Sequence, residues 1–212
     1  MINQLLIATW QTILMVLIAT LFGIFIGIPL GVLLFGTTRF GLFENLFLNR
    51  ILGFFVNIIR STPYLILIIA LIPITRILIG TSIGTLAASV SLSVAAIMLY
   101  CRIVEDALKG IPKGLIEAAQ SMGANKLQII SKVILPEALP QLISGLTLII
   151  ISLIGFSAMA GMVGGGGLGD LANRYGYQRY DTFVIFEVMV ILIIMVQGVQ
   201  SLGDSLVKKT RK

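Results

Sequence analysis

Five long apolar stretches, separated by short polar segments, divide the chain. They cover about residues 12–35, 53–74, 83–100, 142–163 and 183–202. Each is long enough to cross the hydrocarbon core of a bilayer as a helix, which takes roughly 17–25 residues. Because backbone polar groups in that core must be satisfied internally, helices are the expected form. The pattern predicts an all-α polytopic membrane protein with five transmembrane helices, in a single transmembrane domain over residues 1–212 whose core is about 12–204.

Composition supports this assignment and excludes other classes of protein. Mean hydropathy is +1.06, and 11% of the residues are charged, against about 25% in soluble proteins. The net charge of +6 lies in short loops and a tail, so we expect no nucleic-acid partner. With no His and one Cys, we expect neither a metal site nor a Ser–His or Cys–His catalytic pair. The chain has no G-x-x-x-x-G-K-[ST] loop, so we expect a transport subunit that is not an enzyme and binds no cofactor itself.

The longest segment that is too polar for a bilayer is residues 111–140. Pro112 suits the first turn of a helix over residues 115–122, because its missing N–H costs no hydrogen bond there. Glu117 then falls in the first turn, where the helix dipole favours a carboxylate. Gly123 can close this helix in the left-handed conformation.

A second short helix is expected after this break. Asn125 stands at its N-cap, with Gln128 positioned to complete a capping box. Pro136 is expected to end or kink it. The segment therefore predicts two short helices that form a compact knob on a membrane surface.

The basic residues predict the orientation of the chain, because cytoplasmic loops carry the excess of Lys and Arg. With the N-terminus outside and the C-terminus in the cytoplasm, Arg76, Arg174 and Arg179 face outward and Arg60 lies within the membrane. Eleven of the 15 basic residues then face inward, which are Arg39, Arg50, Arg102, Lys109, Lys113, Lys126, Lys132, Lys208, Lys209, Arg211 and Lys212. The knob at residues 111–140 would face the cytoplasm.

Small residues and breaks mark the first three spans. Gly23, Gly27 and Gly31 recur every four residues, which allows close helix contact either within the chain or between two copies. Pro29 is expected to kink the first span. The third span carries one small, weakly polar face suited to helix packing, formed by Ser82, Thr85, Ser89, Ser93 and Ala96.

The second span is interrupted by Arg60–Pro63. An arginine at the centre of a span costs about 2.5–3.5 kcal/mol. Broken helices in membranes usually face protein or a water-filled cavity. Arg60 and Pro63 are therefore candidates for a gate or a structural break, with an arginine that snorkels to the interface as the alternative.

The fourth span is the candidate to line a solute pathway. Ser152, Gly155, Ser157 and Met159 supply small, polar and thioether groups, and a thioether is an adaptable neighbour for an apolar solute. Ordinary core packing is the alternative. The following Gly164–Gly169 run matches G-x-G-x-x-G, but a dinucleotide site is excluded because a membrane helix precedes it where that motif needs a strand.

The glycine run is instead expected to give the fourth span a flexible end, with Gly164 and Gly167 as candidate gate or structural residues. Beyond it, Tyr175, Tyr177 and Tyr180 suit a membrane–water interface or a contact surface for a partner.

The knob at residues 111–140 resembles a known motif. Glu117-Ala118-Ala119, Gly123 and Val133–Pro136 match the spacing of EAA---G---------I-LP, with Val133 where the motif usually has Ile. That motif marks permease subunits of ATP-binding-cassette importers of type I. The resemblance implies that the segment is a coupling helix that docks on a cytosolic ATPase, which holds the ATP and Mg. It assigns the coupling role to Glu117, Ala118, Ala119, Gly123, Leu135 and Pro136.

Further segments resemble permeases of bacterial methionine uptake transporters. They are RSTP at Arg60–Pro63, PITRILIGTSIG at Pro73–Gly84, GLIEAAQSMGA at Gly114–Ala124, LPEALP at Leu135–Pro140 and GFSAMAGMVGGGGLG at Gly155–Gly169. The resemblance implies import of methionine by alternating access in a bacterial cytoplasmic membrane. It also implies a homodimer of permeases, two ATPase subunits inside and a substrate-binding protein outside. Five helices are also few to enclose a pathway, so a symmetric homodimer is expected on that ground too.

Three alternatives remain open at this stage. The same architecture could import another amino acid or a quaternary-amine osmolyte, although no interior aromatic cluster suggests a cage for such a cation. A secondary transporter would work without an ATPase and would need an ionisable residue near the midplane, whereas Glu187 lies near the outer end of its span. A membrane scaffold without transport is the third.

Overall fold

The computed structural model describes residues 1–39 and 41–210. Every regular element in these residues is helical. The α-helices are α1 (Ile2–Phe22), α2 (Ile28–Gly36), α3 (Leu46–Ser61), α4 (Tyr64–Ala70), α5 (Ile72–Ile79), α6 (Thr85–Lys109), α7 (Lys113–Ser121), α8 (Lys126–Ile129), α9 (Leu135–Ala160), α10 (Gly167–Leu171) and α11 (Thr182–Thr210). Wider π-helical turns occur at Gly23–Gly27, Ile130–Ile134 and Ala172–Tyr177, whereas Gly161–Gly165 contains a kink at Val163 and Gly164.

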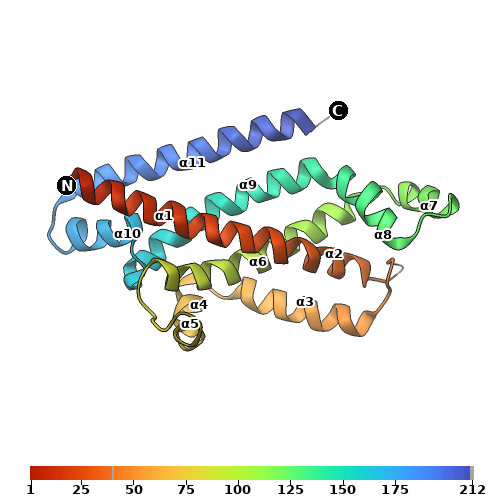
Figure 1. Cartoon of the computed structure of the whole chain (residues 1–212), viewed down its shortest axis with the longest axis horizontal. Coiled ribbons are helices and arrows are strands. Elements are labelled where there is room, and N and C mark those ends of the chain that lie inside the picture. The colour runs from red at the N-terminus through yellow and green to blue at the C-terminus, as the bar shows by residue number, and fades with distance from the viewer. Residues whose placement is uncertain (40, 211–212) are drawn as a thin grey trace.

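The helices run back and forth along one long axis. Figure 1 shows α1 and α2 leaving the N-terminal end, α3 returning beside them, α6 and α9 running in opposite directions, and α11 leading back to the far end. Four stretches of the described residues are long and apolar enough to span a membrane, and the bent pair α3 and α4 makes a fifth. The predicted all-α membrane fold is confirmed, and the two termini lie at opposite ends as five passes require (Figure 1).

The predicted spans mark the apolar parts of these helices and not their ends. The first helical stretch already begins at Ile2, and the second begins at Leu46, not at residue 53. Asn45 caps α3 because its side chain accepts a hydrogen bond from the Leu48 N–H at 3.0 Å. Hydropathy identifies the residues that are apolar enough for a bilayer, whereas a capping side chain can start the helix several residues earlier.

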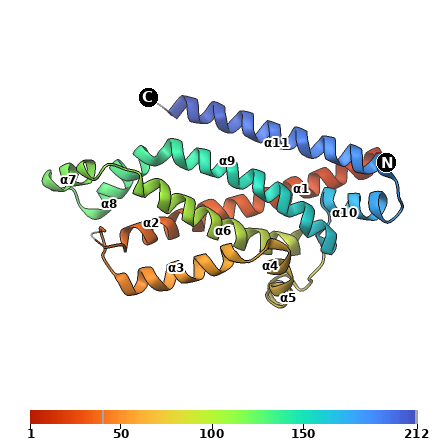
Figure 2. The same ribbon diagram turned by 180° about the vertical axis from the view of Figure 1, so that it is seen from behind.

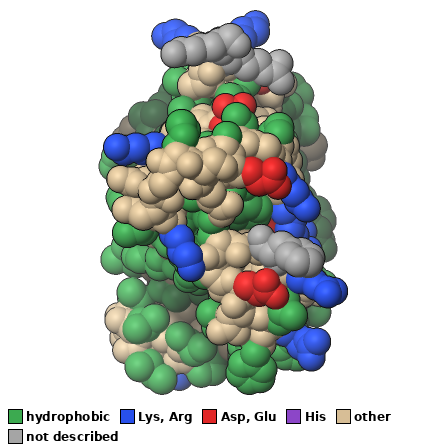
Figure 3. Space-filling model, turned by 90° about the vertical axis from the view of Figure 1, so that its right-hand side faces the viewer, with side chains coloured by type: hydrophobic (Ala, Val, Ile, Leu, Met, Phe, Trp, Pro, Cys, Tyr) green, Lys and Arg blue, Asp and Glu red, His purple; other side chains and the backbone are tan. Residues whose placement is uncertain are grey.

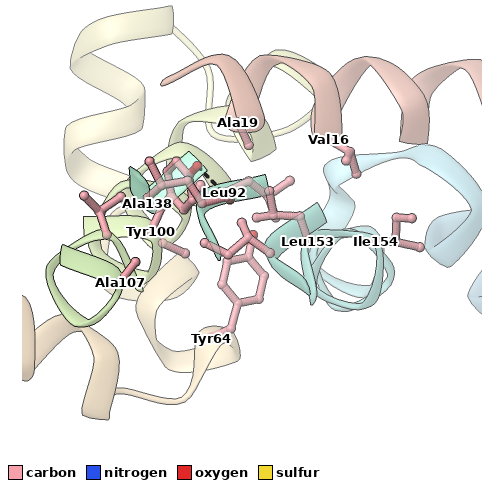
Figure 4. Packing of buried hydrophobic residues seen from close by; sticks show 14 of the residues in the cluster. Val16, Ala19, Tyr64, Leu92, Tyr100, Ala107, Ala138, Leu153 and Ile154 are labelled. Atoms are coloured by element: carbon pink, nitrogen blue, oxygen red, sulfur yellow. Dashed lines mark hydrogen bonds between the residues drawn. The ribbon is translucent and has the colours of Figure 1, made fainter. Parts of the chain in front are cut away.

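The core is built around α6, which crosses the middle of the molecule (Figure 2) and packs against α1, α2 and α9. In its most apolar stretch 61% of the residues are buried inside the protomer. Figure 4 shows Leu92 and Tyr100 of α6 among Ala19 of α1, Leu153 of α9 and Tyr64 of α4. The small polar face predicted for the third span packs inward, since Ser89, Ser93 and Ala96 are all buried.

The glycine stripe of the first span contacts α6 of the same chain. A Cβ at Gly23 would lie 3.3 Å from the Ala96 Cβ, and one at Gly31 would lie 2.6 Å from the Val104 Cβ. Of the two interpretations of these glycines, close helix contact within the chain therefore applies. Pro29 lies at the start of α2 just after a π-helical turn, so the helix widens before the proline.

By contrast, α11 is poorly covered by its own protomer. In its most apolar stretch only 11% of the residues are buried. It touches α9 closely where Gly203 meets Thr147, because a Cβ at Gly203 would overlap the Thr147 side chain. Most of this helix therefore faces lipid or another subunit.

Candidate functional site

Residues 111–140, the predicted coupling segment, have the expected helix, break and second helix. Pro112 precedes α7 as its N-cap residue. Gly123 has φ +77, the left-handed conformation expected of it. Asn125 and Gln128 form a capping box, each side chain bonded at 2.9 Å to the other residue's backbone N–H. The predictions for Gly123 and for the Asn125–Gln128 capping box are thus confirmed, whereas Pro112 stands one position before the first helical turn in which it was expected.

Pro136 neither ends nor kinks the second helix, and that prediction was wrong. The chain continues as one helical stretch from Lys126 to the end of α9 at Ala160. Pro136 lies in the first turn of α9, directly after the π-helical turn Ile130–Ile134. The wider turn replaces the ordinary hydrogen-bond ladder just where proline supplies no N–H, so the helix axis continues. The coupling segment is therefore one short helix joined to the base of a long one.

Glu117 lies in the second turn of α7 and not in the first, which corrects the dipole argument. The helix begins at Lys113 and has no acidic residue in its first turn. Glu117 and Ala118 are exposed, whereas Ala119 faces inward at 2% exposure. The carboxylate is thus presented outward, where it can meet a partner.

Sequence reasoning missed two exposed apolar residues beside the Gly123 turn. Met122 is 82% exposed and Leu127 is 75% exposed. They flank the turn at the tip of the molecule formed by α7 and α8 (Figure 1). The sequence did contain a signal for this exposure: both are large apolar residues in an otherwise polar segment, one just after the end of α7 and one just after the Asn125 N-cap. Together with Glu117, Ala118 and Gly123 they form an exposed set that is called the docking tip below, after the role that the motif resemblance implies for this segment.

The helical segments that carry the docking tip are packed against the hydrophobic core of the protein. Ala119, Ile129, Ile134 and Ala138 are buried in the same hydrophobic cluster as the central α6 residues. Ile129 and Ile134 come from the base of the long helix and are 1% and 0% exposed. A displacement of α7 and α8 would therefore also displace residues that pack against α6.

A buried carboxylate forms ion pairs within the C-terminal part of α6. Glu105 is 3% exposed and pairs with Arg102 at 2.6 Å and Lys109 at 2.5 Å. The pairs are three and four residues apart, the spacing at which helical side chains meet. Because a buried ion is stable only when paired, these two cations are what permit Glu105 at this position.

The candidate pathway residues of α9 separate into two faces. Ser152, Gly155 and Met159 are exposed on one side of the helix, and no atom lies within 4 Å of a Cβ built at Gly155. Ser157 is 1% exposed, and its hydroxyl donates to the Ile154 carbonyl at 2.7 Å. Ser157 therefore belongs to the core, and its prediction as a pathway residue was wrong for this protomer structure.

The break in the second span is a sharp bend. The axes of α3 and α4 differ by 110° on either side of Thr62 and Pro63. Arg60 is exposed and lines a small hollow with Tyr64, Met98 and Phe156. The rings of Tyr64 and Phe156 are stacked with their centroids 4.7 Å apart, which joins α4 to α9.

The Gly164–Gly169 turn is fixed in place, contrary to the flexible end expected. Gly164 and Gly167 have φ +87 and +76. The Gly167 N–H donates to the Gln11 side chain and the Leu168 N–H to the Thr12 hydroxyl, both at 2.9 Å. Glycine is needed here for left-handed backbone and close approach to α1, so these residues are structural.

The aromatic segment beyond the turn is helical up to Tyr177. The Arg179 guanidinium lies 4.5 Å from the Tyr175 ring centroid, and the Tyr175 hydroxyl accepts a hydrogen bond from Gln4 at 2.9 Å. Tyr177 and Tyr180 are 73% and 90% exposed. Tyr175 therefore joins α1 to this segment, while the other two rings project outward.

The chain is similar to known transport proteins. Residues 23–209 match the family described as the inner membrane component of binding-protein-dependent transport systems. The chain belongs to this family. A probable D-methionine transport system permease protein, MetI, of Vibrio cholerae is 55% identical over 207 residues, which cover 98% of this chain and 92% of the relative. The D-methionine transport system permease protein MetI of Salmonella typhi is 51% identical over 150 residues, which cover 71% of this chain and 69% of the relative.

Solved structures agree with the fold of the permease. An inward-facing structure of the MetNI methionine ABC transporter gives a TM-score of 0.98 at 45% identity, covering 100% of this chain and 98% of that one. A structure of an amino acid ABC transporter, at 21% identity and a TM-score of 0.74, supports the fold alone. The permease is thus a multi-pass inner-membrane transport component without a catalytic role of its own, as the motif resemblance predicted.

Proposed function

We propose that this permease carries methionine across the cytoplasmic membrane by alternating access, driven by a separate ATPase. The docking tip is the observation that supports this role most directly. It presents Glu117 and the Gly123 turn outward while its inner face is continuous with the membrane core. The two relatives described above are named as D-methionine permeases, which favours methionine among amino acids.

The ATPase belongs on the tip for a physical reason. The chain has no phosphate-binding loop, so the work of transport must enter through contact. Exposed Met122 and Leu127 supply apolar area, which partner interfaces use at their centre. ATP and Mg are then held by the two partner ATPase subunits and not by the permease.

A second permease subunit completes the pathway in this proposal. The open face of α9 carries Ser152, Gly155 and Met159 with no cover from the same protomer. A symmetric dimer places such a face opposite its copy and encloses a channel between the two. Arg60 and Pro63 lie at the α3–α4 bend beside this helix. A change in the angle between α3 and α4 would alter the access of the solute to the channel. An extracytoplasmic binding protein delivers the solute at the opposite end from the docking tip.

The orientation can be tested with single cysteines, using the unaltered chain as the control. Cys101 is 0% exposed, so the unaltered permease should not react with a membrane-impermeant maleimide from either side. We expect Met122→Cys to label only in inside-out vesicles and Tyr180→Cys only in right-side-out vesicles. These measurements are made on permease expressed without its ATPase, which would cover Met122. The reverse pattern would place the N-terminus in the cytoplasm.

Uptake by vesicles tests the proposed function. Proteoliposomes containing permease and ATPase, with binding protein outside, receive a panel of labelled amino acids outside, with and without ATP and Mg enclosed in the lumen. We expect ATP-dependent uptake of methionine, with the D and L forms measured separately. Uptake without the ATPase would indicate a secondary transporter, and no uptake with a docked, active ATPase would indicate a different solute or a scaffold.

Met159→Ala should change transport and not assembly. Its side chain is 43% exposed on the open face of α9, so truncation removes surface from the pathway and leaves the core intact. We expect a several-fold change in methionine KM or in the preference for competing amino acids. Ser157→Ala on the buried face is the matched control and should leave substrate preference unchanged. Altered preference in Ser157→Ala alone would place the pathway on the other face.

A further inference from the structure

A groove opens beside the docking tip, between α7, the base of α9 and the end of α11. Its volume is about 700 Å³, and it is lined by two lysines, Lys132 and Lys209, and by apolar Leu115, Val133 and Leu139. At Pro140 it meets a second hollow of about 370 Å³. The second hollow continues along α9 past Gly145 to Leu148 and is bounded by Val207 of α11. The first hollow thus carries two lysines beside Glu137, and the second is lined by apolar Ile103, Ala107 and Leu148 together with polar Asp106, Gln141 and Ser144.

The two lysines are available to bind a ligand. The ion pairs of the described residues involve Arg102, Lys109, Arg174 and their carboxylates, and neither Lys132 nor Lys209 takes part in one. Both are exposed and reach the groove from different helical segments. Figure 3 looks onto this end of the molecule, where Lys and Arg side chains surround a smaller number of acidic ones.

We propose that this groove binds an anionic glycerophospholipid of the cytoplasmic leaflet. The phosphate lies between Lys132 and Lys209, and an acyl chain follows α9 from Pro140 toward Leu148. Basic pockets between transmembrane helices on the cytoplasmic side are suited to such head groups, because each Lys near the surface contributes about 1 kcal/mol of attraction. The apolar stems of the lysines cover the upper part of the chain while their ammonium groups reach the head group.

Glu137 narrows the choice of head group. It is exposed and lies among the groove residues, also without an ion pair in the described chain. A carboxylate repels a bare phosphate but accepts hydrogen bonds from hydroxyl groups. Phosphatidylglycerol, with one phosphodiester charge and a glycerol head group, therefore suits the site better than phosphatidic acid.

Native mass spectrometry of the detergent-purified permease–ATPase complex tests this site. The complex is titrated separately with phosphatidylglycerol, phosphatidic acid and phosphatidylcholine of identical acyl chains. We expect phosphatidylglycerol to be retained most strongly. The double variant Lys132→Gln/Lys209→Gln should weaken its retention by about 25-fold, about five-fold for each lysine. Glu137→Gln should reduce the preference for phosphatidylglycerol over phosphatidic acid.

Lys208→Gln is the matched control, because Lys208 is exposed next to Lys209 but does not line the groove. It should lose less than two-fold. Equal loss in Lys208→Gln would mean diffuse attraction to a basic tail and would overturn the site. Equal retention of phosphatidylcholine would show that charge plays no part, and no retained lipid in a complex with active ATPase would mean that the groove is not a lipid site; either result would overturn the proposal. Each of these outcomes leaves methionine transport to be judged by the uptake assay alone.

Discussion

Gly123→Pro should abolish stable docking of the ATPase while the permease remains inserted. Gly123 has φ +77, whereas proline is restricted to about −65°. Its N–H also donates to the Gln120 carbonyl at 2.9 Å, a bond that proline cannot make. The turn between α7 and α8 would therefore change shape. We expect at least a ten-fold loss of ATPase in co-purification and a parallel loss of ATP-driven transport in proteoliposomes.

Glu117→Lys should weaken the same contact by reversing an exposed charge, and Glu117→Gln should do so less. Gly114→Ala is the control for both, since a Cβ there meets no atom within 4 Å and alanine favours a helix. If Gly123→Pro and Glu117→Lys bind the ATPase and transport like the unaltered chain, the docking tip is not the coupling element.

Gly169→Ala should destabilise the permease more than any conservative change on its surface. A Cβ at Gly169 would overlap the Ala158 carbonyl oxygen, and one at Gly161 would overlap the Asp170 nitrogen. Both clashes involve backbone, so no rotamer change relieves them. Overpacking alone costs about 1–3 kcal/mol, and we expect the upper end or more. At this chain length that lowers the thermal midpoint by roughly 10 °C.

Gly198→Ala provides the opposite expectation for the same chemical change. Gly198 lies within α11 and has no atom within 4 Å of its added Cβ. Alanine there should be neutral or stabilising by up to about 1 kcal/mol, because it has the higher helix propensity. Thermal unfolding in detergent, followed by size-exclusion chromatography, measures both. A midpoint unchanged by Gly169→Ala would mean that the contact between α9 and α10 is looser than the structure shows.

Local signals in the sequence predicted local structure well. Asn125, Gln128 and Gly123 act within a few residues of themselves, so their roles could be inferred without knowing the fold. The Gly164–Gly169 turn could not be inferred in this way. Its rigidity depends on hydrogen bonds to Gln11 and Thr12, which are 156 residues away in sequence.

The sequence also could not show which face of α9 is buried in the protomer. Periodicity placed Ser152, Gly155 and Met159 near one another, but it could not say that Ser157 points to the opposite, covered side. That depends on α6 and α4, which pack against α9. Pro136 was misjudged because a π-helical turn beside it absorbs the missing hydrogen bond, and no simple pattern announces such a turn. The last two basic residues of the tail, Arg211 and Lys212, lie outside the described residues.

The shared core of the docking tip sets the boundaries for building hybrid transporters. Replacing only α7 with the equivalent segment of another permease would put a foreign side chain at the buried position of Ala119, against core residues of this chain. Ile129, Ile134 and Ala138 belong to the same cluster and would have to be exchanged with it. The smallest transplantable unit therefore runs from α7 into the first turns of α9, and a chimera cut at Gly123 should assemble poorly even if its new tip matches its ATPase.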